Sequence, residues 1–148
     1  MRYLSTFISG FDEPIRAVLS ESVSDVAVEQ MLDGAVVYQT SELRDKLRGL
    51  RFFNNTFQVL RRYDGDHQPI AAMLEQLNCD AKLESDLAFL RSRHNRSFRV
   101  VCSDENTLIS IGQDKLDRIE HTIQAATGLA PRRAKADFEF WVYSRREG

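Results

Sequence analysis

The sequence lacks most of the motifs by which enzymes bind metals and nucleotides or activate nucleophiles. Its two cysteines, Cys79 and Cys102, lie far apart and outside any CxxC or CxxH pair, which predicts reduced, buried side chains. The three histidines are isolated, so their spacing indicates neither a metal site nor a nucleophile and base pair. No GxGxxG, GxxxxGK[ST], HExxH or GxSxG motif occurs. We therefore expect no catalytic residue and no metal ligand in this chain.

Long apolar runs are also missing. The longest uncharged apolar stretches are a few residues, as at 35–38, and none could span a bilayer. The first residues carry one Arg and no sustained apolar segment before Asp12 and Glu13, so a secretory signal is not expected. These features predict a cytoplasmic protein without a membrane partner.

What the sequence does have is the composition of a globular protein and an uneven distribution of charge. Its 148 residues are 43% hydrophobic and 28% charged, enough for one domain or two small ones. The formal net charge is -2, but residues 1–88 hold 9 Lys+Arg against 14 Asp+Glu, whereas residues 89–148 hold 11 against 8. This asymmetry indicates a surface for a polyanion in the second half.

The first half predicts the order β-α-β-β-α-β. Residues 3–9 read as a buried strand, and the apolar spacing after Pro14 predicts a helix with one inward face. Asp33-Gly34 predicts a hairpin between strands at 26–32 and 35–40. A short helix capped by Ser41 and ended by Gly49 follows, and a last strand begins after Phe52. The side chains expected to face inward from the two helices are Ile15, Val18, Leu19, Val23, Leu43 and Leu47. This is the ferredoxin-like order.

The second half predicts the order α-α-β-α-β. Residues 64–69 form the clearest boundary, so we expect domains at 1–66 and 67–148. Two short helices, a strand at 98–102, a brief extended piece at 108–111, a helix from about 113 to Gly128 and a strand from Phe138 follow. The chain then stops where another strand is expected, so we interpret it as a fragment cut at a domain edge. The predicted fold class is α+β.

Several motifs of the second half resemble a known RNA-binding domain. Residues 98–129, FRVVCSDENTLISIGQDKLDRIEHTIQAATGL, and 136–148, ADFEFWVYSRREG, are similar to the THUMP domain of RNA-modifying enzymes. They look most like the version fused to the N-terminus of bacterial relatives of tRNA guanosine N2-methyltransferases. The motifs are ATGL at the helix end, a short basic loop and the aspartate-led strand DFEFW. Residues 1–63, with MLDGAVVY and LRFFNNTF, look like the ferredoxin-like subdomain before THUMP, so the resemblance covers the whole chain.

The resemblance implies a function in binding rather than in catalysis. In such proteins the THUMP unit grips RNA, typically the acceptor end of tRNA, and a further strand and a Rossmann-like methyltransferase domain follow. Neither is present in this chain. We therefore expect no cofactor here, S-adenosylmethionine in the missing domain, and an enzyme only in the full-length protein.

Two basic runs are the candidate RNA contacts. Arg132, Arg133 and Lys135 lie in the loop between the last helix and the last strand, where cations can reach phosphates without disturbing the core. A second run precedes the strand at 98 and comprises Arg91, Arg93, His94, Arg96 and Arg99. If both runs lie on one side of the sheet, they form one groove. The alternatives are a solvated turn for the loop, and Arg stems that cover apolar surface for the second run.

Two aromatic side chains of the last strand are further candidates for contact with RNA bases. Trp141 and Tyr143 share a strand face, and we expect them to pack against the helices rather than to stack on bases.

The alternative function is a ferredoxin-like module for protein or small-molecule interaction or dimerisation, in which an uncovered sheet edge pairs in a homodimer. A hydrolase of the acylphosphatase kind is disfavoured, because Asp12 and Glu13 would repel a phosphate there.

Overall fold

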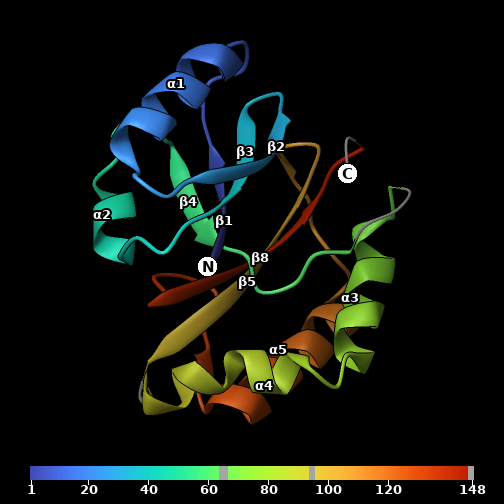
Figure 1. The fold of residues 1–148 in the computed structure, drawn as a ribbon. Helices are drawn as coiled ribbons and strands as arrows, with labels where there is room; N and C mark the ends of the chain where they lie inside the picture. Colours follow the sequence, from blue (N-terminus) through green and yellow to red (C-terminus); the bar gives the residue numbers. More distant parts are fainter. Residues whose placement is uncertain (64–66, 94–95, 147–148) are drawn as a thin grey trace. The chain divides into compact units, whose positions relative to one another are not determined.

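The structure is a computed structural model. It describes residues 1–63, 67–93 and 96–146, except for the side chains of 92 and 93. The chain divides into two compact units, Met1–Arg62 and Tyr63–Gly148, each with its own four-stranded sheet. The predicted α+β class is confirmed (Figure 1). Among the described residues, no helix has the length and apolar character needed to cross a membrane.

The first unit has the predicted element order β-α-β-β-α-β. Its elements are β1 (Arg2–Thr6), α1 (Asp12–Ser22), β2 (Ala27–Leu32), β3 (Ala35–Gln39), α2 (Arg44–Arg48) and β4 (Asn55–Gln58). The sheet is antiparallel with strand order β2-β3-β1-β4, and its registers include Tyr3↔Tyr38 and Leu4↔Phe57. The β2–β3 hairpin turns at Asp33-Gly34 as predicted, because Gly34 takes a φ of 75° that other residues resist.

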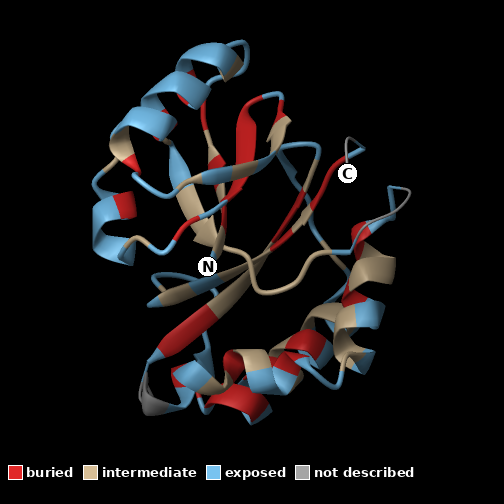
Figure 2. Cartoon of the chain, viewed as in Figure 1, coloured by how far each residue is buried: buried red, intermediate tan, exposed pale blue. Residues whose placement is uncertain are grey.

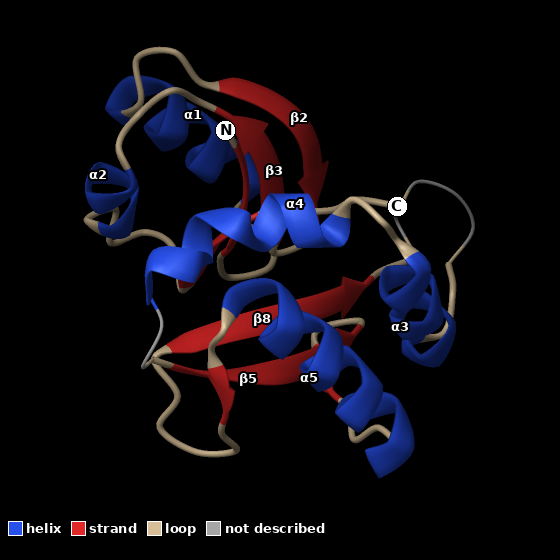
Figure 3. Ribbon diagram, turned by 90° about the horizontal axis from the view of Figure 1, so that it is seen from below, coloured by secondary structure: helices blue, strands red, loops and turns tan. Residues whose placement is uncertain are grey.

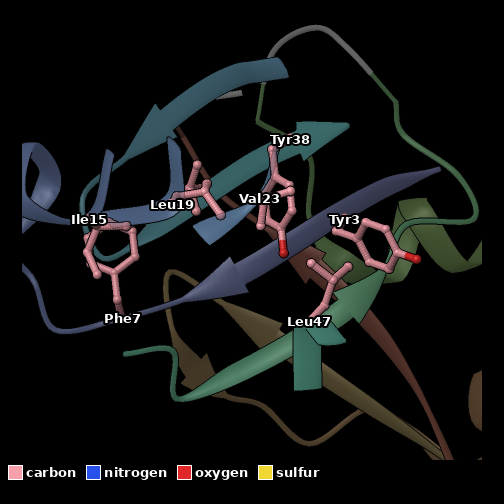
Figure 4. Close-up of a cluster of buried hydrophobic side chains, with 8 residues drawn as sticks. Tyr3, Phe7, Ile15, Leu19, Val23, Tyr38 and Leu47 are labelled. Atoms are coloured by element: carbon pink, nitrogen blue, oxygen red, sulfur yellow. The ribbon is translucent and has the colours of Figure 1, made fainter. Parts of the chain in front are cut away.

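The core of the first unit lies between its sheet and the two helices. Figure 4 shows side chains from β1, β3, α1 and α2 converging there. Leu19 and Val36 are fully buried, and burial of each such side chain contributes about 1.5–3 kcal/mol. The buried Tyr38 hydroxyl is hydrogen-bonded to the Ser5 hydroxyl at 3.1 Å, so the only polar atom of this ring has a partner. Burial raises the pKa of Tyr38.

Three side chains of the first unit do not lie where the pattern predicts. Val18 is 37% exposed, because Ile15 and Leu19 fill the narrow apolar face of α1 and leave Val18 at its border. Leu43 is 76% exposed, because α2 begins only at Arg44 and is too short to turn both leucines inward. Ser41 does not cap α2.

Ser41 instead contacts the loop after α1. Its backbone N–H donates to the Asp25 carboxylate at 2.8 Å, and its hydroxyl and that of Thr40 donate to the same group. These hydrogen bonds, that of the Ser41 hydroxyl first, lower the pKa of Asp25 to about 2. Asp25 therefore joins the loop before β2 to the loop after β3.

The second unit places a helical layer on one side of a small sheet. Its elements are α3 (Ile70–Cys79), α4 (Leu83–Leu87), the 3₁₀ helix η1 (Ala88–Arg93), β5 (Ser97–Asp104), β6 (Thr107–Leu108), α5 (Gln113–Thr127), β7 (Ala130–Pro131) and β8 (Phe138–Ser144). β5 pairs with β8 and β7 in parallel and with β6 antiparallel. Figures 1 and 3 show α5 along one face of the β5–β8 pair, and α5 packs against α3, α4 and η1.

One face of this sheet carries the apolar core of the unit, whereas the buried side chains of β5 on the other face are the small polar residues Ser97 and Ser103. Phe98, Cys102 and Val142 share one face and are buried, and Figure 2 shows the inner side of α5 buried with them. Phe98 and Phe140 meet edge to face with ring centroids 5.6 Å apart. The unit thus has its own core between this face and the helices.

Candidate nucleic-acid interface

The loop of residues 132–137 joins two strands on opposite edges of β5. Phe98 of β5 is paired with Pro131 of β7 and also with Phe138 of β8, and one strand residue can have only one neighbour on each edge. The loop therefore crosses past the start of β5 from one edge to the other. We call it the β7–β8 loop.

The chain enters the β7–β8 loop through a fixed helix end. Gly128 takes the left-handed conformation, with φ 74°, and its N–H donates to the Gln124 carbonyl at 2.8 Å. The buried Thr127 hydroxyl donates to the Ile123 carbonyl at 2.7 Å and accepts from the Leu129 N–H at 3.1 Å. The Arg132 N–H then donates to the Phe98 carbonyl at 2.7 Å, so the loop begins at a defined point.

Asp137 fixes the other end of the loop. Its carboxylate accepts hydrogen bonds from the N–H and the hydroxyl of Ser97, both at 2.8 Å, and from Arg96 Nη1 at 3.0 Å. The Ser97 bonds, followed by that of Arg96, hold the pKa of Asp137 below its usual range. Asp137 is the aspartate that leads the DFEFW motif, and we predicted no role for its side chain from the sequence. Its place directly before an apolar strand is the signal from which this role could have been predicted.

The three cations of the β7–β8 loop are exposed. Arg133 Nη2 donates to the Gln113 side-chain oxygen at 2.8 Å, and Arg133 lies close enough to Glu120 to oppose the burial that raises the pKa of that carboxyl. Within the described part of the chain, the side chains of Arg132 and Lys135 have no hydrogen-bond or ion-pair partner. Lys135 also takes a φ of 53°, which is uncommon for a residue with a Cβ. Arg132 and Lys135 thus present positive charge that no carboxylate among the described residues neutralises.

The second basic run is largely engaged within the unit. Arg91 donates from Nη2 to Glu84 at 2.6 Å and from Nε to the Ala126 carbonyl at 2.9 Å. Arg99 Nε donates to Glu139 at 2.8 Å across the β5–β8 pair. With Arg96 held by Asp137, each of these three cations has a carboxylate partner. His94 and the side chain of Arg93 lie outside the described residues.

These partners also show which predicted residues come together. Arg96 is joined to the β7–β8 loop through Asp137, and Arg91 is joined to the end of α5, two residues before Gly128. Arg99 lies on the sheet face opposite to Phe98, with Glu139 as its neighbour. The structure therefore gathers Arg91 and Arg96 near the loop, but their charge is compensated.

The aromatic pair lies on the other face of the sheet from the one we expected. By strand alternation, Trp141 and Tyr143 share the Glu139 face, opposite to Phe140 and Val142. They therefore do not pack against the helices. Trp141 Nε1 donates to Glu139 at 2.9 Å, and this bond, with those of Arg99, holds the pKa of Glu139 below its usual range.

A surface hollow of about 420 Å³ lies between α3 and α5 and was not expected from the sequence. Its lining comprises Asn78, Asp117, Arg118, His121 and Thr122. The Thr122 hydroxyl donates to the Asn78 side-chain oxygen at 3.1 Å, which joins the two helices at this point. The lining carries both signs of charge and defines no ligand.

Comparison with known proteins relates the fold, but not the sequence, to two other proteins. No family model and no curated protein matches the sequence. TrmN from Thermus thermophilus matches 98% of this chain with a TM-score of 0.62 at 15% identity. A predicted N6-adenine-specific DNA methylase from Listeria monocytogenes str. 4b F2365 matches 97% of it with a TM-score of 0.54 at 13% identity.

The matches cover only 42% of the TrmN chain and 37% of the methylase chain. The chain thus spans less than half the length of either. At these identities the likeness shows the fold alone. The fold of this chain is therefore similar to that of a part of TrmN and of a part of the predicted DNA methylase.

Proposed function

We propose that this chain is an RNA-binding module that positions a structured RNA, above all the acceptor end of tRNA, for a methyltransferase domain. In this proposal residues 1–66 are a ferredoxin-like subdomain and residues 67–148 a THUMP-like domain. The methyltransferase domain follows in the same protein, uses S-adenosylmethionine and supplies the chemistry. In this proposal the protein acts in the cytoplasm.

The observation that carries the proposal is the β7–β8 loop. Arg132 and Lys135 are exposed, and within the described residues no carboxylate neutralises them, whereas Arg91, Arg96 and Arg99 are paired. The loop is fixed at both ends by backbone hydrogen bonds and by Asp137. A loop backbone that is fixed at both ends loses little conformational entropy on binding, so the loop is suited to present its cations to an RNA backbone.

The likeness to TrmN and to the DNA methylase supports the remainder of the proposal. Both matches extend over almost the whole of this chain, and both proteins are more than twice its length. The element order of the first unit and the helix, loop and strand of the second agree with the THUMP resemblance of the sequence. We infer that binding is sequence-tolerant and depends on RNA shape and strand ends.

Titration of labelled tRNA with the chain tests this function. Fluorescence anisotropy at several salt concentrations gives the affinity and its salt slope, with double-stranded DNA as the competing ligand. We expect saturable binding that prefers tRNA. If the three loop cations each contact a phosphate, raising the salt from 50 to 200 mM should weaken binding roughly 20-fold through these three contacts alone.

A matched pair of triple variants locates the interface. R132A/R133A/K135A should weaken binding and lower the salt slope by about 2, because each phosphate contact contributes about 0.7 to it. R16A/R48A/R51A removes the same charge from exposed residues of the first unit and should change the slope much less. Equal effects of the two variants, or an unchanged slope in the first, would remove the loop from the mechanism.

A further inference from the structure

Three potential metal ligands meet at the end of β5 farthest from the β7–β8 loop. His67 lies ahead of α3, Asp104 ends β5, and Glu105 begins the turn to β6. His67 Nε2 lies 2.9 Å from Asp104 Oδ1 and 4.0 Å from Glu105 Oε1. One ligand atom from each of the three side chains lies within 4.8 Å of the other two. The sequence predicted no metal site, because His67 is separated from the two carboxylates by more than thirty positions.

The backbone that carries these side chains is held by one buried residue. The Glu105 N–H donates to the Ser144 carbonyl at 3.0 Å, and the Ser144 hydroxyl donates to the Gln68 carbonyl at 3.1 Å. Ser144 is only 4% exposed. Glu105 and Asn106 take positive φ values of 47° and 64°, which define the tight turn to β6. The two segments that supply the ligands are thus joined through the hydrogen bonds of Ser144.

We propose that His67, Asp104 and Glu105 bind a divalent transition-metal ion, with Zn²⁺ as the best match. Zinc takes imidazole nitrogen and carboxylate oxygen at about 2.0–2.2 Å, so tetrahedral ligand atoms lie about 3.3 Å apart. The distances from the imidazole nitrogen to the two carboxylates lie on either side of that value. The imidazole favours zinc over Mg²⁺ or Ca²⁺, which prefer oxygen ligands, and water completes the coordination.

Arg146 is an exposed positive group beside the Glu105 carboxylate, and its backbone N–H donates to Glu105 Oε1 at 2.5 Å. Its Nε lies 3.9 Å from Glu105 Oε1, and its side chain is 79% exposed. An exposed ion pair contributes little to stability, so the guanidinium can move into solvent when a metal enters. Replacement of Arg146 by Ala should therefore tighten zinc binding, because it removes the competing charge and no ligand.

Calorimetric titration with ZnCl₂, and separately with MgCl₂, tests the site. The tag-free chain is used in a Cys79→Ser background, because the exposed Cys79 thiol can itself bind zinc. We expect one zinc ion per chain at micromolar free zinc and no magnesium binding. H67A should weaken zinc binding at least about tenfold.

Two further variants keep the test decisive. H121A removes an exposed histidine on α5 outside the cluster and should leave zinc binding unchanged. E105Q keeps a similar shape but removes one anionic ligand, so it should weaken binding even if H67A folds poorly. The proposal would be overturned if no zinc binds even at a concentration 100-fold above the expected micromolar range. It would also be overturned if zinc binding is unchanged in both H67A and E105Q.

Discussion

Replacement of Gly128 by Ala should destabilise the second unit without creating a clash. Gly128 ends α5 with φ 74° and ψ 6°, and its N–H donates to the Gln124 carbonyl. A Cβ built on Gly128 would meet no atom within 4 Å, so the cost is conformational. The left-handed region costs a residue with a Cβ about 1–2 kcal/mol. We therefore expect the free energy of unfolding to fall by about 1–2 kcal/mol.

Urea unfolding followed by tryptophan fluorescence measures this change in the unit that contains it. Trp141 is the single tryptophan of the chain and lies in β8, in the same unit as Gly128. With a urea slope of about 2 kcal/mol per molar, the expected loss lowers the midpoint by about 0.5–1 M. The slope itself should not change, because the variant exposes no additional surface on unfolding.

Gly112 provides the matched control at the other end of the same helix. Its φ is -54°, and a Cβ there would also meet no atom within 4 Å. The loss of a glycine N-cap and the gain from a less flexible unfolded chain oppose each other, so G112A should change stability by less than about 0.5 kcal/mol. If G128A and G112A shift the midpoint equally, the left-handed conformation of Gly128 is not what stabilises this end of α5.

Two further predictions concern the aspartates that join loops. Asp25 has a lowered pKa of about 2 in the folded chain. Its contribution to stability is therefore present above its ordinary pKa of 3.8 and is lost as the pH falls toward 2. Urea unfolding between pH 5 and pH 2 should show this loss in the wild type and not in D25N. D137A should weaken tRNA binding about three- to tenfold in anisotropy titrations, because the loop cations would no longer be held in place. Since D137A also removes a negative charge, tighter binding would show that charge alone, and not loop order, controls affinity.

Local signals in the sequence were sufficient to predict much of the fold. Asp33-Gly34 defined the hairpin, and the apolar spacing with Gly128 defined the last helix, because turn chemistry and helix ends depend on neighbouring residues. Val18 and Leu43 were misplaced because periodicity does not give the width of a buried face or the first residue of a short helix.

The site could be predicted only in part, because pairing across strands is not a local property. The loop that carries Arg132, Arg133 and Lys135 was predicted, because Gly128 and the apolar strand from Phe138 are local signals on either side of it. The partners of Arg96 and Arg99, however, depend on the register that sets Phe98 beside Phe138, forty positions along the chain. The same register decides which sheet face carries Trp141. Neither could be obtained from the order of residues alone.

The crossing of the β7–β8 loop past β5 has a consequence for how this protein can diversify. β7 and β8, the neighbours of β5 on its two edges, lie about 9–10 Å apart in the sheet, whereas the six residues from Arg132 to Asp137 can extend to about 20 Å. The loop therefore has spare length, and its middle can be lengthened, shortened or given other charges while both strands keep their register. Mutations in the middle of the loop can then alter what is bound without altering the sheet, whereas mutations at Asp137 alter both the start of the sheet and the placement of the loop cations.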